Sequence, residues 1–263
     1  MRGSSLDRDA RIKFTIGTKK HGDAEGQFSN PRGLAFDHHR GLLLVADCNN
    51  NRVQVFSSDD GGSFVSKFGE EDNQPGQFQH PDGLCIDHDH DRILVVDSGY
   101  DHLQSWSLSD QSFLSCIGHL GSGDLEFFRP QGIAIDKHHH RIVIVDSNNH
   151  RLVFLSSIDL SFLFSVGGKR GSQPGEFYSP SGIAIDHDRH RIIVCDNFTH
   201  RIWSCIRRAS RSHRLLGRPS SACDWSQSMA CRHVHMASRS SSTCSIMDQA
   251  HGVDDDDDSI AGR

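Results

Sequence analysis

GEFYSPSGIAID, residues 175–186, is the last of four nearly identical phrases in this chain of 263 residues. The other three are GQFSNPRGLAFD at 26–37, GQFQHPDGLCID at 76–87 and LEFFRPQGIAID at 125–136. The Phe that the phrases share falls at Phe28, Phe78, Phe127 and Phe177, which gives spacings of 50, 49 and 50 residues. Internal repeats of this length are typical of solenoids, propellers and arrays.

Each repeat predicts four short strands. In the third copy they are GIAID at 132–136, RIVIVD at 141–146, RLVFL at 151–155 and SFLFSVG at 161–167. The runs are rich in β-branched residues and bounded by turn residues, which is the pattern of strands. Four antiparallel strands in about 50 residues are typical of a propeller blade. We therefore expect an all-β propeller with blades near 26–69, 76–118, 125–167 and 175–217.

The two ends of the chain depart from the repeat. RIKFTIG at 11–17 resembles a fourth strand, and we expect it to pair beside 201–205 if the ring closes with four blades. The other candidate for that place is SHRLLG at 212–217. Residues 1–10 are expected to be flexible. Residues 218–263, rich in Ser and Arg and then in Asp, lack the apolar residues for a core and are expected to be disordered.

Composition narrows the class of protein. The formal net charge of −6 argues against a polyanion-binding protein by bulk charge, and the chain shows neither a signal peptide nor a run long enough to cross a membrane. The eight cysteines form no CxxC pair, so they are expected to be reduced thiols. These features favour a cytoplasmic, intracellular protein.

The repeated phrases resemble NHL repeats, whose pattern runs from G-x-F-x-x-P-x-G through an apolar strand ending in Val-x-Asp to N-H-R-[IV]. The Asn-His pair stands here as Asn149-His150, followed by Arg151 and Leu152. The resemblance covers about 11–205. Rings of this family usually have six blades, so four copies imply an incomplete ring, a ring completed by a partner, or an unusual closure with four blades.

The resemblance also implies a role. NHL propellers form the C-terminal module of RING/B-box ubiquitin ligases, where they bind substrate, and of RNA-binding translational regulators. We therefore expect a non-catalytic scaffold for a protein partner, linked to ubiquitin-dependent degradation and protein ubiquitination. The alternatives are an RNA-binding post-transcriptional regulator and a metal-dependent lyase or hydrolase. No RING-type Cys/His spacing occurs in the sequence, so ligase activity itself is not implied.

Residues that recur in every copy are interpreted as scaffold. An Asp ends each second strand, and an Arg follows five residues later in three copies, where the two can pair or bind loop N–H groups. These residues are Asp47, Asp97, Asp146 and Asp196 with Arg52, Arg151 and Arg201. A second Asp column, at 37, 87, 136 and 186, is expected to cap the turn after the first strand.

Positions that differ between copies are the better candidates for contact with a ligand. The Pro-x-Gly loop and the loop between the second and third strands should lie at the same end of the propeller, and Tyr100 and Phe198 offer large rings there. The candidate ligand face comprises Arg32, Asn50, Asp82, Tyr100, His102, Gln131, Asn149, His150, Ser181, Phe198 and His200.

The sequence offers no clear catalytic or metal centre. Histidines gather in the turns after the first strand, at DHHRG (37–41), DHDHDR (87–92), DKHHHR (136–141) and DHDRHR (186–191). Imidazoles bind zinc, but each turn belongs to a different blade, so the clusters are not expected to converge. We therefore expect no catalytic residue, no metal, no cofactor and no small-molecule substrate.

Overall fold

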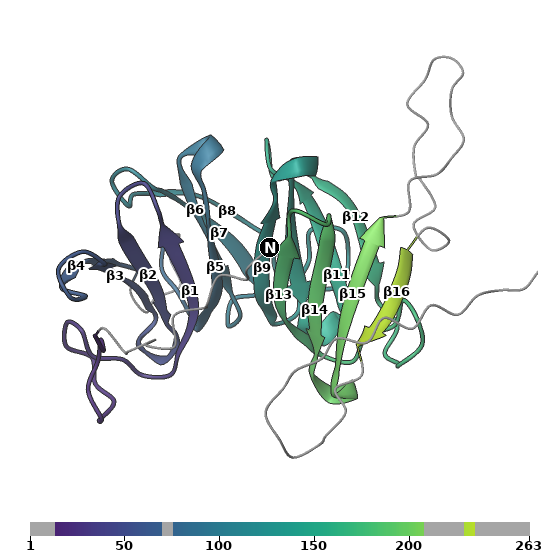
Figure 1. The fold of residues 1–263 in the computed structure, drawn as a ribbon, viewed down its shortest axis with the longest axis horizontal. Coiled ribbons are helices and arrows are strands. Elements are labelled where there is room, and N and C mark those ends of the chain that lie inside the picture. Colours follow the sequence, from purple (N-terminus) through teal and green to yellow (C-terminus); the bar gives the residue numbers. More distant parts are fainter. Residues whose placement is uncertain (1–13, 70–75, 208–228, 235–263) are drawn as a thin grey trace, which may run out of the picture.

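The computed structural model describes residues 14–69, 76–207 and 229–234 (Figure 1). Four antiparallel four-stranded sheets make up this part of the chain, and the strands of each sheet follow one another in sequence order. The fold is therefore the expected all-β propeller. None of the described helices is long and apolar enough to cross a membrane.

The strand bounds follow the repeat. Blade 1 is β1 (Pro31–Asp37), β2 (Leu42–Asp47), β3 (Arg52–Ser57) and β4 (Phe64–Phe68). Blade 2 is β5 (Pro81–Asp87), β6 (Arg92–Asp97), β7 (His102–Ser107) and β8 (Phe113–Ile117). Blade 3 is β9 (Pro130–Asp136), β10 (Arg141–Asp146), β11 (Arg151–Ser156) and β12 (Phe162–Gly167). Blade 4 is β13 (Pro180–Asp186), β14 (Arg191–Asp196), β15 (Arg201–Arg207) and β16 (Met229–Val234).

Short 3-10 turns join the strands. Those after the second strands are η1 (Cys48–Asn50), η4 (Ser147–Asn149) and η5 (Asn197–Thr199), and those after the first strands are η2 (His88–His90) and η3 (Lys137–His139). The residue that follows η1 or η4 has a positive φ, 51° at Asn51 and 55° at His150. Asn and His tolerate this left-handed conformation better than β-branched residues do. The His of the Asn149-His150 pair therefore has a backbone role.

The apolar core lies between neighbouring blades. Three buried clusters fill the junctions of blades 1 and 2, 2 and 3, and 3 and 4. Alternate residues of the second strands serve different junctions, so that Leu94 packs towards blade 3 whereas Ile93 and Val95 pack towards blade 1. This two-sided packing explains why these strands are apolar nearly throughout.

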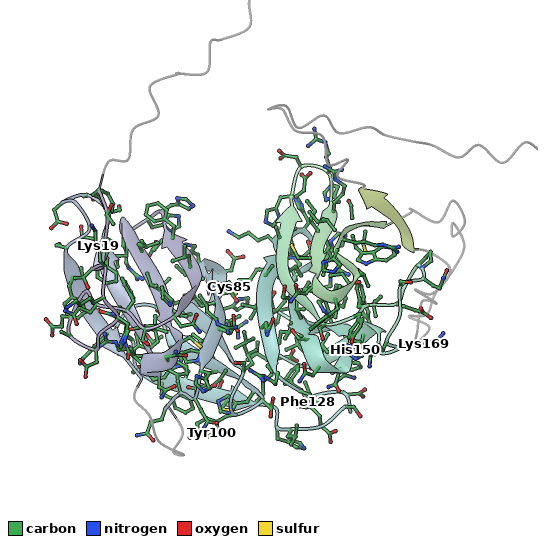
Figure 2. All side chains as sticks on the ribbon, turned by 90° about the horizontal axis from the view of Figure 1, so that it is seen from below. Lys19, Cys85, Tyr100, Phe128, His150 and Lys169 are labelled. Carbon is green, nitrogen blue, oxygen red and sulfur yellow. The ribbon has the colours of Figure 1, made fainter. Side chains whose placement is uncertain are left out.

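The four blades follow one another along an arc. The innermost strands contact each other in the order β1, β5, β9, β13, and among the described residues β1 and β13 do not share such packing. Figure 2 shows the ribbons of blades 1 and 4 apart from each other across the opening of the arc. The blades therefore form an incomplete ring in this structure.

The outer edge of blade 4 is β16, which lies inside the segment 218–263 that we expected to be disordered. β15 pairs with β16, and residues 14–17, the described part of 11–17, do not pair with it. The pairing of 11–17 was expected only for a ring that closes with four blades, and the arc of the described blades does not close. A strand ladder is made of backbone groups, so an open edge can accept a segment that is poor in apolar residues. The alternative candidate at 212–217 lies outside the described residues.

The described part of 11–17 lies beside blade 1 instead. Residues 14–17 form no strand. The side chains of Phe14 and Ile16 lie next to Gly62, in the turn between β3 and β4, and Gly17 lies next to the ring of Phe28. Residues 14–17 thus pack on the first blade and do not pair with the fourth.

Candidate binding face

The Pro-x-Gly loop and the loop after the second strand meet at one end of the propeller, as expected. Backbone hydrogen bonds join them in all four blades, where the N–H groups of Asn49, Gly99, Asn148 and Phe198 donate to the carbonyls of Ser29, Gln79, Phe128 and Tyr178. We call this end of the molecule the loop end. Its side chains are therefore held by two connected loops in each blade.

The Asp and Arg columns tie these loops together. In blade 1 the fully buried Asp47 accepts hydrogen bonds from the Ser29 N–H at 2.7 Å and from Arg52 Nε at 2.9 Å. The rest of the Arg52 guanidinium donates to the carbonyls of Asp23, Ala24 and Gln27. A buried charge is tolerated when it is paired and its remaining hydrogen-bonding groups are satisfied. This pair can thus hold the Pro-x-Gly loop against the strands.

Blade 3 repeats the arrangement. Asp146 accepts from the Phe128 N–H at 2.8 Å and from Arg151 Nε at 2.8 Å, and Arg151 also donates to the carbonyls of Ser122, Gly123 and Glu126. Blade 4 differs, because Asp196 accepts from Thr199 and Trp203, while Arg201 donates to the Ser172 carbonyl.

Two of the expected contact residues are engaged inside their own blades. The Asn50 amide donates to Asp47 and to the Gly22 carbonyl, each at 2.8 Å. Asn149 does the same with Asp146 at 2.8 Å and the Gly121 carbonyl at 2.7 Å. These amides therefore hold the loops, and a ligand would have to compete with those bonds.

Two further candidates pair with each other across a junction. Arg32 of blade 1 donates to Asp82 of blade 2 at 2.5 Å. Burial raises the pKa of Asp82, and the Arg32 charge acts in the opposite direction. At the matching positions Gln131 and Ser181 are half-buried. The variable residue of the Pro-x-Gly loop is thus used at this junction as an ion pair between blades.

Blade 2 has His102 where blades 1 and 3 have Arg. Its Nε2 lies 3.6 Å from the buried Asp97 carboxylate, whose oxygens accept from the Gln79 N–H at 2.7 Å and the Gly99 N–H at 3.2 Å. Burial raises the pKa of Asp97 to about 7, against the effect of these backbone donors. Burial also lowers the pKa of His102 to about 4. Without a permanent cation beside it, Asp97 keeps its proton to a higher pH than an ordinary carboxyl does, and His102 stays neutral to a lower pH than an ordinary imidazole.

Among the described residues the most exposed phenylalanine ring belongs to Phe198, which is 59% exposed and lies at the loop end. It stacks on Tyr178, with ring centroids 4.8 Å apart and an angle of 24° between the planes. Arg170 lies over the other part of the stack, with its Cζ 4.0 Å from the Tyr178 centroid, and its guanidinium donates to the Tyr178 hydroxyl. The edge of His150 meets the same Tyr at 5.7 Å.

An open cavity of about 430 Å³ lies beside this stack. Its lining includes Arg170, Tyr178, Phe198 and Arg201, which we call the blade-4 platform. Two flat rings and two guanidinium groups offer apolar area, stacking and hydrogen-bond donors in one place. Such a combination is suited to an aromatic or acidic group of a partner.

The structure thus unites some of the expected residues and separates others. Phe198 and His150 both contact Tyr178, whereas Tyr100 of blade 2 contacts His102, at a centroid distance of 5.7 Å. Figure 2 shows Tyr100 well apart from His150 and Lys169. His200 is exposed in the loop that also carries Phe198.

The sequence reasoning missed Arg170 and Tyr178. A signal for Tyr178 was available, because the position after the shared Phe differs in every copy, as Ser29, Gln79, Phe128 and Tyr178. Phe128 is itself 41% exposed. Arg170 precedes the repeated phrase, so comparison of the four copies could not single it out.

The histidine-rich turns at the opposite ends of the strands correct another expectation. The rings of His39 and His88, from blades 1 and 2, have centroids 4.3 Å apart, and those of His138 and His190, from blades 3 and 4, are 4.6 Å apart. The turns therefore converge in pairs. The expectation of separate clusters was wrong because neighbouring blades pack closely enough for turns at the same height to touch.

Comparison with known proteins identifies the repeat. Residues 28–56 and 177–204 match the family model described as NHL repeat. The chain contains NHL repeats. It is 39% identical over 66 residues to protein lin-41 of Caenorhabditis elegans, and 46% identical over 55 residues to human tripartite motif-containing protein 2. These matches cover 25% and 21% of this chain but only 6% and 7% of the two relatives.

Solved structures agree on the fold. A chain of a nidogen/laminin complex is 19% identical with a TM-score of 0.52, over 66% of this chain and 59% of that one. A streptogramin B lyase is 14% identical with a TM-score of 0.51, over 68% of this chain and 52% of that one. At such identities these structures support the propeller fold and nothing about activity.

Proposed function

We propose that this chain is a non-catalytic interaction scaffold that binds a protein partner through the blade-4 platform at its loop end. The observation that carries the proposal is the exposed Phe198–Tyr178 stack beside an open cavity. Binding energy in protein interfaces is concentrated in a few aromatic and Arg side chains. The NHL repeats and the partial likeness to a tripartite motif protein are consistent with this role.

We further propose that the partner is a protein whose ubiquitination depends on this recognition. This step rests on the resemblance to the propeller module of RING/B-box ligases. It gives the scaffold a purpose that needs no catalytic group in the chain itself, because the propeller would select the substrate and another component would modify it.

Binding of RNA is the second candidate, favoured by one specific observation. Arg170 and Phe198, which both contact the Tyr178 ring, have with it the composition of a base-stacking surface with a cation. The neighbouring charges give less support. Lys169 is paired with Glu176 at 2.5 Å, so the loop does not offer the run of unpaired cations that phosphate binding favours.

Affinity capture from cell extract tests the proposal. Wild-type chain, Phe198→Ala and Ile158→Ala are compared by quantitative mass spectrometry, with and without ribonuclease. Ile158 is 69% exposed in the turn between β11 and β12, so its variant removes a similar apolar side chain elsewhere on the same molecule. We expect Phe198→Ala to reduce recovery of the specific partner at least about 10-fold, and Ile158→Ala to leave it unchanged.

The outcomes separate the candidates. Loss of recovery after ribonuclease treatment would favour the RNA alternative. Equal recovery with all three chains would reject the blade-4 platform as the binding site. The link to ubiquitin requires, in addition, that ubiquitination of the captured protein in cells rises with wild-type chain and not with Phe198→Ala.

A further inference from the structure

Each first strand ends in an Asp, at 37, 87, 136 and 186, and the one in blade 1 differs from the other three. In blades 2, 3 and 4 the Asp pairs with an Arg five residues later, which lies opposite it in the strand register. Arg92 Nη2 lies 2.9 Å from Asp87, Arg191 Nη2 lies 2.6 Å from Asp186, and Arg141 pairs with Asp136. In blade 1 the residue opposite Asp37 is Leu42.

Asp37 is nevertheless fully buried. Its Oδ1 accepts the N–H groups of His39 at 2.9 Å and Arg40 at 3.2 Å, which fixes the carboxylate. Its Oδ2 is buried and has no hydrogen-bond partner. Leaving a buried carboxylate oxygen without a donor is costly, and the other three copies avoid that cost through their Arg.

Two imidazoles surround this carboxylate. His88, from the turn of blade 2, places its Nε2 3.8 Å from Asp37 Oδ1 and is 19% exposed. The His39 ring lies beside the His88 ring, tilted by 41° from it. One ligand atom from each of Asp37, His39 and His88 lies within 4.8 Å of the others. Tetrahedral zinc with bonds of about 2.0–2.1 Å needs ligand atoms about 3.4 Å apart, so the imidazole nitrogens would have to move closer when the ion binds.

We propose that Asp37, His39 and His88 bind a zinc ion that joins the turns of blades 1 and 2. The cation would take the place of the missing Arg beside Oδ2, and the neutral imidazoles would supply two nitrogen ligands, with water completing the coordination. His and carboxylate are common zinc ligands in this combination. The ligands come from two blades, so the ion would also stabilise that junction.

Arg40 is the cation that would compete with zinc for the Asp37 carboxylate. Its Nη1 lies 3.5 Å from Asp37 Oδ2, while the same nitrogen donates to the Leu108 carbonyl at 2.9 Å and Nη2 lies 3.6 Å from Asp91. Arg40 therefore has other acceptors to hold it when the ion enters. Its charge should weaken zinc binding, so we expect Arg40→Gln to bind zinc more tightly than wild type.

The histidines of blades 3 and 4 provide a matched control. His138 and His190 also meet across a junction, but the carboxylate there, Asp136, is occupied by His139 at 2.8 Å and by Arg141. This second cluster, which also includes His139 and His187, therefore has at least as many imidazoles but no open oxygen on Asp136. Zinc affinity that came merely from clustered histidines would be lowered by substitution at either pair.

Zinc titration of the untagged full chain tests the site, with zinc chloride as the probe and a chromophoric chelator as the competitor. We expect wild type to bind one ion that His88→Ala and Asp37→Asn lose, with affinity lowered at least about 10-fold. We expect His190→Ala to match wild type. The most discriminating variant is Leu42→Arg, which removes no ligand but places the Arg of the other repeats opposite Asp37. We expect it to abolish both zinc binding and the rise of the thermal midpoint that zinc causes in wild type.

Wild-type affinity in Leu42→Arg, or equal losses in His88→Ala and His190→Ala, would overturn the proposal. Asp37→Asn alone decides nothing if it unfolds, because Asp37 also holds the turn. Circular dichroism of each variant without zinc checks the fold, and the Leu42→Arg and His88→Ala results carry the decision.

Discussion

Blade 3 and blade 1 are built from the same repeat but differ in what surrounds them. Blade 3 lies between two neighbours, and Ile133 on its innermost strand is 8% exposed. The matching residue of blade 1, Leu34, is 64% exposed, because no blade covers that side of β1 among the described residues. Blade 3 also keeps both Asp–Arg pairs of the repeat, whereas blade 1 keeps Asp47 with Arg52 and has only the more distant Arg40, at 3.5 Å, beside Asp37.

The difference teaches how to read the repeat. A recurring residue occupies the same position in the strand ladder of each blade, but its contribution to stability depends on the residues around it. Strand register is the same in blades 1 and 3, so their ladders need no adjustment. What changes is whether an apolar side chain is removed from water and whether a carboxylate has its cation.

Ile133 and Leu34 occupy the same position of the repeat in blades 3 and 1, and shortening the buried Ile133 should cause the largest loss of stability. Ile133→Ala removes side-chain atoms packed between blades 2 and 3 and leaves a cavity, so we expect about 3 kcal/mol lower unfolding free energy. Leu34→Ala removes an exposed side chain and should change the unfolding free energy by less than about 0.5 kcal/mol. Urea denaturation at pH 7 measures both. Similar losses in the two variants would mean that β1 is covered in solution.

Glycines of the Pro-x-Gly loops extend the comparison to blade 4. A Cβ on Gly132 would lie 2.4 Å from the Ser181 carbonyl oxygen and about as close to side chains of Val145 and Ile183 as any real contact allows, at 3.0 and 3.1 Å. On Gly182 the nearest heavy atom would be Cys195 Sγ at 3.6 Å. The first position lies between blades 3 and 4, and the second faces the open side.

We therefore expect Gly132→Ala to cost about 2 kcal/mol, because backbone of β9 or β13 must shift. Gly182→Ala should be neutral or slightly stabilising, since Ala loses less conformational entropy than Gly in a strand. Thermal unfolding of the two variants beside wild type provides the measurement. A clear loss in Gly182→Ala would contradict the open position of β13.

Much of this structure could be predicted from the repeat. Strands such as 132–136 and 141–146 were found nearly to the residue, because Pro, Gly and Asp mark where the chain turns. The partner of β15 could not be predicted, since an outer strand pairs through backbone hydrogen bonds and places few requirements on the side chains of its partner. Contacts between turns of different blades, such as His39 with His88, depend on the distance between sheets, which no single repeat encodes.

The candidate site was predictable only in part, for the same reason. Phe198 was expected because a large ring in a polar loop stands out in one copy. Its partner Tyr178 comes from a different loop of the same blade, and Arg170 comes from the segment before the repeat. Their stacking follows from the three-dimensional position of those loops, so it became visible only in the structure.

The smallest effect concerns the Asp of blade 2 that lacks an Arg. Burial raises the pKa of Asp97 to about 7, well above that of a carboxyl in the unfolded chain, near 3.8. Between about pH 4 and pH 7 the folded state therefore keeps a proton that the unfolded state has released. The contribution of Asp97 to stability is fully present below about pH 4 and is lost as the pH rises through 7.

Asp97→Asn should remove this pH dependence. The stability of wild type relative to the variant should fall by about 1–2 kcal/mol from pH 4 to pH 7, less than the full shift implies because the site can relax. Any loss from the altered acceptor for the Gln79 N–H is constant with pH and does not affect the slope.

The difference between the two proteins must be measured, because His102 works in the opposite direction. Burial lowers its pKa to about 4, so its contribution to stability rises with pH between about 4 and 6.5 and masks the slope of Asp97 in wild type alone. His102 is present in both proteins and largely cancels in their difference. Urea denaturation at intervals across this range gives the profile. A flat difference would show that the Asp97 carboxylate is as well compensated as Asp47, which has Arg52 at 2.9 Å.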